Sequence, residues 1–381
     1  MVQNQKRLDF IDAARGLAVL GVLLVHAGSA ANLRNPELAR LTAQGARGVQ
    51  LFFVISAFTL LYSAQYKSKI ERHFIWNFFV RRFFRIAPLF YTAMLVYLVR
   101  GGHENDYWLG AQQHVTGLQT MATIFFVNGW KNEWINSLVP GGWSVVVEMN
   151  FYLLLPIIFY KIKNLKSALS LWMLVMIMSV LINYLTMSWR SGNEAWLNGQ
   201  FLFFWLPNQM PVFFSGVVFY FIYINYLENP GKQIEAVAPG LTLIGLYLVF
   251  AAAWVVDNFW LPNYIISTIG FGLMLSGLAA FPTTWLVNNF TKFMGKISYS
   301  FYLFHFLILW IAEKQMLFQN IHSDYLRLGL MYVIILAWAG AAAWLTYTLV
   351  EVPGQKLGKI IIDKIESRYE KADKAVIEAG I

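Results

Sequence analysis

Cysteine is absent from this chain of 381 residues, and charged residues make up only 13% of it. The absence of cysteine excludes disulfides, thiol nucleophiles and thiolate metal sites. The sequence also lacks the spacing of a metal-ligand set, a glycine-rich phosphate loop and the strand-to-helix elbow that carries a serine nucleophile. We therefore expect no metal cofactor and no serine hydrolase of the usual form.

Hydrophobic residues, by contrast, account for 58% of the chain and aromatic residues for 17%, and the mean hydropathy is +0.52. This composition is too apolar for a soluble protein and supplies many membrane spans of about 20 residues. The net charge of +9 is distributed between the apolar segments and does not form a nucleic-acid-binding surface. The sequence predicts an all-α, polytopic membrane protein in the lipid bilayer, with no nucleic-acid partner.

The apolar segments predict about ten transmembrane helices, over residues 11–29, 47–65, 80–99, 144–160, 168–188, 202–226, 239–256, 263–282, 297–317 and 326–350. Basic residues concentrate in alternate loops, which favours both termini in the cytoplasm. The N-terminus imitates a signal peptide, but Asp9 and Asp12 favour an uncleaved first helix. We expect one transmembrane domain over residues 1–353 and a short amphipathic cytoplasmic tail over residues 354–381.

Ionisable residues within the apolar segments are candidates for a functional site, because such groups are costly in a membrane. Arg15 and His26 share the first segment, where eleven helical steps place them on nearly the same face, about 16 Å apart along the axis. Asp12 precedes Arg15 by three residues and is expected to fix its orientation. Alternatively, Arg15 reaches the cytoplasmic interface and His26 only ends the span.

Glu148 is expected near the outer end of the fourth segment, at a depth similar to that of His26. A carboxylate beside an imidazole orients the ring and favours general-base catalysis. The two residues therefore predict an acid–base site near the external face. The alternative is that Glu148 is protonated or pairs with a structural arginine.

Arg81, Arg82 and Arg85 form a cluster where the third segment is expected to enter the membrane from the cytoplasm. Arg82 and Arg85 are three residues apart and share a helical face. Guanidinium groups bind phosphate oxygens in a bidentate geometry, so the cluster predicts a phosphate-bearing ligand. The alternative is that these residues fix the orientation of the helix and contact anionic lipid headgroups.

Three further polar residues fall within the apolar segments or at their ends: Ser56, His305 and Glu351. A lone histidine such as His305 is as often a helix–helix hydrogen-bond partner as a catalyst. Glu351, at the inner end of the last segment, is placed to pair with an arginine of the cytoplasmic cluster. A cytoplasmic anion site and an external acid–base site fit a group-transfer enzyme acting across the bilayer, and they also fit an anion or proton-coupled transporter.

Six motifs in a fixed order resemble those of the acyltransferase 3 family of integral-membrane acyltransferases, over nearly the whole chain. They are DAARG (residues 12–16) with His26, GVQLFFVISAF (48–58), RFFR (82–85) with Pro88, WS (143–144) with Glu148, FY (151–152) and Pro156, Gly295 with SYS (298–300) and YLFH (302–305), and Glu351 with Pro353. Ala57 replaces the commoner glycine of the second motif. Each motif alone is weak, but six in one order are specific.

The resemblance implies transfer of an acyl group, often acetyl, from cytoplasmic acyl-CoA to a carbohydrate outside the bacterial inner membrane. Lipopolysaccharide, exopolysaccharide, peptidoglycan and small glycosides are the implied acceptors. Some members carry an additional SGNH hydrolase-like domain, and this sequence resembles the stand-alone form that lacks it.

The resemblance also implies roles for individual residues. By matching position, His26 is the catalytic residue, with Arg15 and Glu148 assisting it. Arg82 and Arg85, with the adjoining Arg81, bind acyl-CoA. Supporting roles fall to Asp12, Ser56, Ser144, Tyr152, His305 and Glu351. His26 then acts either as a general base or as a transient acyl carrier, and the sequence leaves both open.

Overall fold

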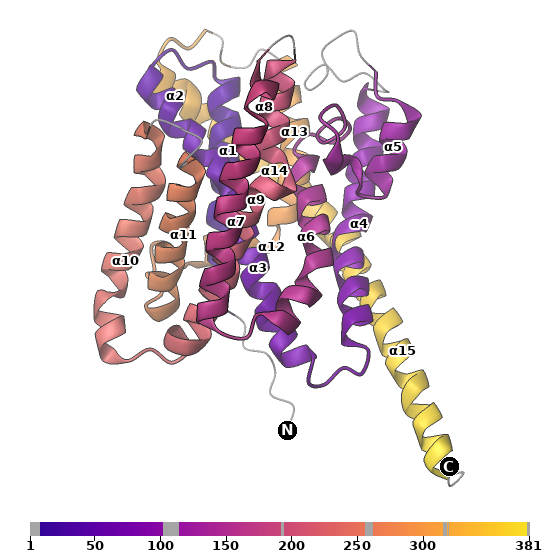
Figure 1. Cartoon of the computed structure of the whole chain (residues 1–381). Helices are drawn as coiled ribbons and strands as arrows, with labels where there is room; N and C mark the ends of the chain where they lie inside the picture. The colour runs from indigo at the N-terminus through magenta and orange to yellow at the C-terminus, as the bar shows by residue number, and fades with distance from the viewer. Residues whose placement is uncertain are drawn as a thin grey trace.

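A computed structural model of the chain describes residues 8–101, 114–191, 194–255, 262–314, 318 and 320–378, with the side chains of residues 314 and 370–378 excepted. The described chain forms a bundle of helices (Figure 1). Among the described residues, nine helical segments are long and apolar enough to cross a membrane, and a bent pair brings the number to ten. The expectation of about ten transmembrane helices is confirmed.

The long helices match the apolar segments of the sequence to within a few residues at most ends. They are α1 (Asp9–Ala30), α3 (Gly48–Lys67), α4 (Phe74–Gly101), α6 (Gly142–Lys161), α7 (Leu165–Leu185), α9 (Leu206–Ile222), α10 (Lys232–Ala251), α11 (Asn263–Ala280), α13 (Ser298–Lys314) and α14 (Asp324–Thr346).

Shorter elements connect the long helices. They are α2 (Pro36–Ala43), α5 (Gly117–Ile124), α8 (Ala195–Phe204), α12 (Asn289–Lys296), the 3₁₀ turns Gln44–Arg47, Asn128–Trp130, Met187–Arg190 and Ala252–Trp254, and the π-helical turns Tyr223–Leu227 and Tyr347–Glu351. The last helix is α15 (Val352–Glu378).

The two faces of the bundle differ in what they carry (Figure 1). Helices α2 and α5 lie at the upper side of the view, and the end of α15 lies at the lower side. The connections that follow α3, α6 and α9 lie together at the lower side (Figure 1), and the first two of them contain lysines such as Lys69 and Lys163. Whether this side faces the cytoplasm, as expected from the sequence, stays a prediction.

The helices also differ in how deeply they are buried. The most apolar part of the α2–α3 segment is 72% buried within the protein, whereas that of α7 is only 11% buried. Helix α7 is apolar on all sides, as expected for a helix that faces lipid. Helices α1, α3, α4, α6 and α13 carry the residues of interest, whereas α7 and α10 are the least buried of the long helices before α14, at 11% and 28%.

Close contact between α1 and α12 requires glycine at two positions. A Cβ atom on Gly16 would lie 2.0 Å from the carbonyl oxygen of Thr291, and one on Gly295 would lie 1.8 Å from that of Asp12. The chain bends by 79° between α12 and α13. This packing brings the start of α13, at Ser298, beside the first turns of α1.

The C-terminal tail continues the last membrane helix. A π-helical turn over Tyr347–Glu351 joins α14 to α15 without a break. Helix α15 packs on α4, where the Nδ2 atom of Asn77 donates to Oε1 of Glu366 at 2.6 Å. The tail is therefore a helix of 27 residues that begins at Val352, two residues before the start expected from the sequence.

Candidate active site

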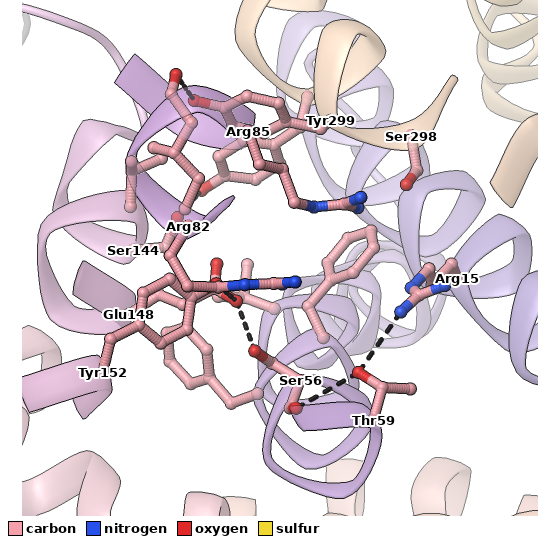
Figure 2. A pocket seen from close by; sticks show the side chains of 16 residues that line it. Arg15, Ser56, Thr59, Arg82, Arg85, Ser144, Glu148, Tyr152, Ser298 and Tyr299 are labelled. Atoms are coloured by element: carbon pink, nitrogen blue, oxygen red, sulfur yellow. Dashed lines mark hydrogen bonds between the residues drawn. The ribbon is translucent and has the colours of Figure 1, made fainter. Parts of the chain in front are cut away.

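A cavity of about 200 Å³ lies inside the bundle between α1, α3, α4, α6 and α13 (Figure 2). One part of its wall is apolar and is formed by Val49, Phe52, Phe53, Ile86 and Val145. The rest is polar and is formed by Arg15, Ser56, Thr59, Arg82, Arg85, Ser144, Glu148, Tyr152, Ser298, Tyr299 and Tyr302. The cavity thus joins most of the polar residues that the sequence singled out.

Three arginines approach the same space from two helices. Figure 2 shows the guanidinium groups of Arg82 and Arg85, on α4, directed toward that of Arg15 on α1. Arg15 donates to Oδ1 of Asp12 at 3.2 Å and to Oγ1 of Thr59 at 3.4 Å. The Nε atom of Arg82 is buried and has no hydrogen-bond partner within the described part of the chain. A buried donor without a partner is unfavourable unless a ligand accepts from it.

Glu148 is the carboxylate of this cavity. Ser56 and Tyr152 both donate to its Oε1 atom, Tyr152 at 2.7 Å. Its negative charge acts on Arg15 and Arg82. With three guanidinium groups and one carboxylate, the lining is net positive, so the cavity favours an anionic ligand.

Glu351 is the last residue of the π-helical turn Tyr347–Glu351 and lies near Arg85. It is 2% exposed and accepts hydrogen bonds from Oγ of Ser300 at 2.8 Å and from Nε2 of Gln355 at 3.1 Å. Its charge acts on Arg85. Arg85 therefore has Glu351 as a counter-charge in addition to Glu148, the carboxylate that also acts on Arg82.

Arg81 does not line the cavity. Its Nη1 atom donates to both carboxylate oxygens of Glu71, at 2.8 and 2.9 Å. Arg81 is one residue from Arg82, and successive residues of a helix point about 100° apart. The expectation that Arg81 joins Arg82 and Arg85 at a common site is not met in this structure.

His26 lies apart from the cavity lining. Its ring contacts those of His305 and Phe306, with centroid separations of 5.2 and 4.4 Å. The sequence led us to expect His26 beside Glu148, and here the structure differs. Helix α6 already begins at Gly142, so Glu148 lies about 9 Å along it and faces the arginines instead.

Tyr302, a residue of the cavity lining, is held in place by a small hydrogen-bonded group. The hydroxyl of Tyr302 donates to the carbonyl oxygen of Gly141 at 2.9 Å, and Oγ of Ser144 donates to the Tyr302 hydroxyl at 2.8 Å. Gly141 has φ of +74°, a left-handed conformation that glycine adopts readily. Tyr302 lines the cavity, and His305 follows it on α13 by about one helical turn.

The sequence missed Thr59, the side chain that holds Arg15 from the opposite helix. It follows Ser56 by three residues and therefore shares its helical face, a spacing that could have identified it. Among the described residues, no group of three or more histidine, aspartate or glutamate side chains is arranged to hold a metal ion.

The sequence profile of a family described as "Acyltransferase domain" matches residues 8–348. The chain is 25% identical over 399 residues to a Staphylococcus aureus (strain COL) protein with a provisional O-acetyltransferase name, and 23% identical over 390 residues to O-acetyltransferase OatA of S. aureus (strain NCTC 8325 / PS 47). Each alignment covers 93% of this chain and 58% of the S. aureus protein, so the chain spans little more than half the length of these relatives.

Acyltransferase MdmB of Streptomyces mycarofaciens is 25% identical over 380 residues, and the alignment covers 92% of both chains. No solved structure matches the chain. The profile covers most of the sequence, and the chain therefore belongs to the acyltransferase 3 family of membrane acyltransferases.

Proposed function

We propose that this acyltransferase moves an acyl group, acetyl foremost, from acyl-CoA on one side of a bacterial inner membrane to a carbohydrate hydroxyl on the other. The cavity with three guanidinium groups is the observation that carries the proposal. The lower side of the bundle is then cytoplasmic, in agreement with its basic connections. The acceptor is a glycoside, exopolysaccharide or lipopolysaccharide that reaches the upper side.

The lining of the cavity suits the donor. The phosphates of acyl-CoA would accept from Arg82, whose Nε atom has no partner among the described residues, and from Arg85 and Arg15. The apolar wall suits the pantetheine arm. Since drug-sized ligands occupy about 300–1,000 Å³, a cavity of about 200 Å³ holds only part of acyl-CoA, and the nucleoside remains outside it.

The length of the pantetheine arm supports this arrangement. About 13 bonds join the phosphate of CoA to its sulfur, and an extended chain advances about 1.2 Å per bond, which gives about 16 Å. Arg15 and His26 are also about 16 Å apart along α1. A donor whose phosphates bind at the arginines would therefore present its thioester at the level of His26, once the arm passes Tyr302.

His26 would act on the hydroxyl that attacks the thioester. In the general-base version, a ring nitrogen of His26 takes the hydroxyl proton while the oxygen bonds to the acyl carbon. The carbon–sulfur bond then breaks, and the proton passes to the leaving thiolate, so that the products are an ester and free CoA. In the second version, His26 itself carries the acyl group between the two steps.

The proposal is tested with purified protein in liposomes that hold radiolabelled acetyl-CoA on one side and a glycan acceptor on the other. We expect labelled glycan and free CoA in equal amounts, and neither product with His26→Ala. Trapping of acetyl on His26 without acceptor would favour the carrier version. Label that crosses the membrane with the thioester intact would contradict the proposal and indicate a transporter.

A further inference from the structure

His305, on α13, is fully buried (0% exposed). The reaction proposed above gives it no role. Its Nδ1 atom lies 2.8 Å from the carbonyl oxygen of Tyr302 and 3.2 Å from that of Phe301. A carbonyl oxygen can only accept, so Nδ1 carries the proton. In the neutral ring, which apolar surroundings favour, Nε2 is consequently an acceptor.

This Nε2 atom has no hydrogen-bond partner among the described residues. Four aromatic rings surround His305 in the described part of the chain: those of His26, Phe301, Tyr302 and Phe306. The two phenylalanines have no donor, and the Tyr302 hydroxyl donates to a backbone carbonyl at the start of α6. His26 is the remaining ring, and it carries an N–H group in either neutral form.

The two imidazoles are close enough to bond. Their centroids are 5.2 Å apart with an interplanar angle of 45°. A ring nitrogen lies about 1.2 Å from the centroid of an imidazole, so small side-chain rotations allow a nitrogen–nitrogen distance of about 2.8 Å, within hydrogen-bond range.

We infer that His305 is a positioning residue for His26: its Nε2 atom accepts a hydrogen bond from one ring nitrogen of His26 and so leaves the other nitrogen unprotonated. The inference rests on the proposed function, in which that second nitrogen takes the hydroxyl proton or bonds the acyl carbon. Both versions of the chemistry need a fixed tautomer, and the bond made by one nitrogen of a histidine determines the state of the other.

Two substitutions of His305 distinguish a hydrogen bond with His26 from a simple packing contact. In His305→Asn, the amide nitrogen replaces Nδ1, but nothing replaces Nε2. In His305→Gln, the amide oxygen reaches the position of Nε2 and can accept from His26. We expect His305→Asn to lower kcat by about 10- to 100-fold, the size of effect seen when the partner that orients a metal-bound histidine is removed. His305→Gln is expected to retain most of the kcat, and the KM for acetyl-CoA is expected to stay unchanged in both.

Phe306→Leu is the matched control, because Phe306 also contacts His26 but offers no acceptor. Equal loss in the Asn and Gln variants, or a loss as large in Phe306→Leu, would show that His305 only packs. Full activity in His305→Asn would overturn the inference while the proposed function stands. Activity in His26→Ala would instead remove His26 from the proposed function.

A second measurement uses the wild-type protein and so does not depend on the folding of variants. The chain has six histidines, and ¹⁵N-labelling of histidine allows the tautomers to be read by NMR. The signal of His26 is assigned by its loss in His26→Ala. We expect a single neutral tautomer at His26, whereas a mixture of the two would contradict a fixed bond to His305.

Discussion

Arg82 and Arg81 are adjacent on α4 but have different surroundings, and this difference gives the sharpest test of the donor site. Arg82 lines the cavity with a buried Nε atom that has no partner among the described residues, whereas Arg81 is held by both oxygens of Glu71. We expect Arg82→Ala to weaken acyl-CoA binding strongly and Arg81→Ala to have little effect on it.

The magnitude follows from the kind of bond that is lost. A hydrogen bond to a charged group contributes about 1.5–3 kcal/mol, and about 1.4 kcal/mol corresponds to a factor of ten in Kd. Loss of the Arg82 guanidinium should therefore raise the Kd for CoA by about 10- to 100-fold. Arg81 does not line the cavity and is paired with Glu71 instead, so its loss should leave the Kd for CoA nearly unchanged.

The assay is calorimetric titration of CoA into each purified variant, with kcat and KM measured from thiol release. Direct binding is needed because KM equals Kd only when chemistry is slow. Arg82→Lys keeps the charge but loses the bidentate geometry and should fall between wild type and Arg82→Ala. Equal Kd values for the Arg81 and Arg82 alanine variants would refute the assignment of this cavity to the donor.

Further predictions concern the groups around the cavity. Tyr302→Leu removes the ring between the cavity and His26, and we expect the ratio of kcat/KM for butyryl-CoA to that for acetyl-CoA to rise by about tenfold or more; an unchanged ratio would contradict the proposed path. Gly141→Ala places a side chain at φ of +74° and only 3.0 Å from the Tyr302 hydroxyl, so thermal melting should show a loss of at least about 1–2 kcal/mol. Gly240→Ala, where no atom lies within 4 Å, is the control and should not lower Tm. Glu148→Gln keeps an oxygen that can accept from Ser56 while removing the charge, and transfer at saturating donor should persist if Glu148 only organises the cavity; loss of transfer would indicate a direct role in the reaction.

The number and ends of the helices could be predicted because each is an apolar run bounded by polar residues. The bend between α12 and α13 could not be predicted in the same way. It depends on the backbone of α12 approaching that of α1 through Gly16 and Gly295, which are far apart in the sequence. Hydropathy records whether a segment is apolar, and it contains no information about which two segments touch.

The site was predictable in composition but not in arrangement. Arg15, Arg82 and Glu148 were each identified as costly groups within a membrane, and all three line the cavity. The predicted end of its helix puts Glu148 at the level of His26. An error of a few residues in that end moves a side chain by about 5 Å along the helix axis and also rotates it around the axis. The direction of a side chain depends on packing, which only the structure supplies.

Under the proposed function, the separation of His26 from the arginines has a physical advantage. A guanidinium beside the imidazole would stabilise the unprotonated ring, but it would also draw water and phosphate oxygens to the reacting centre. In this fold, Arg15 lies about 16 Å from His26 along α1, and under the proposed function the arginines would hold the phosphates of the donor at that distance from the ring. The pantetheine arm of the donor is extended and uncharged, so it can bridge this distance. The thioester would then reach His26 while the phosphates remain bound at the arginines.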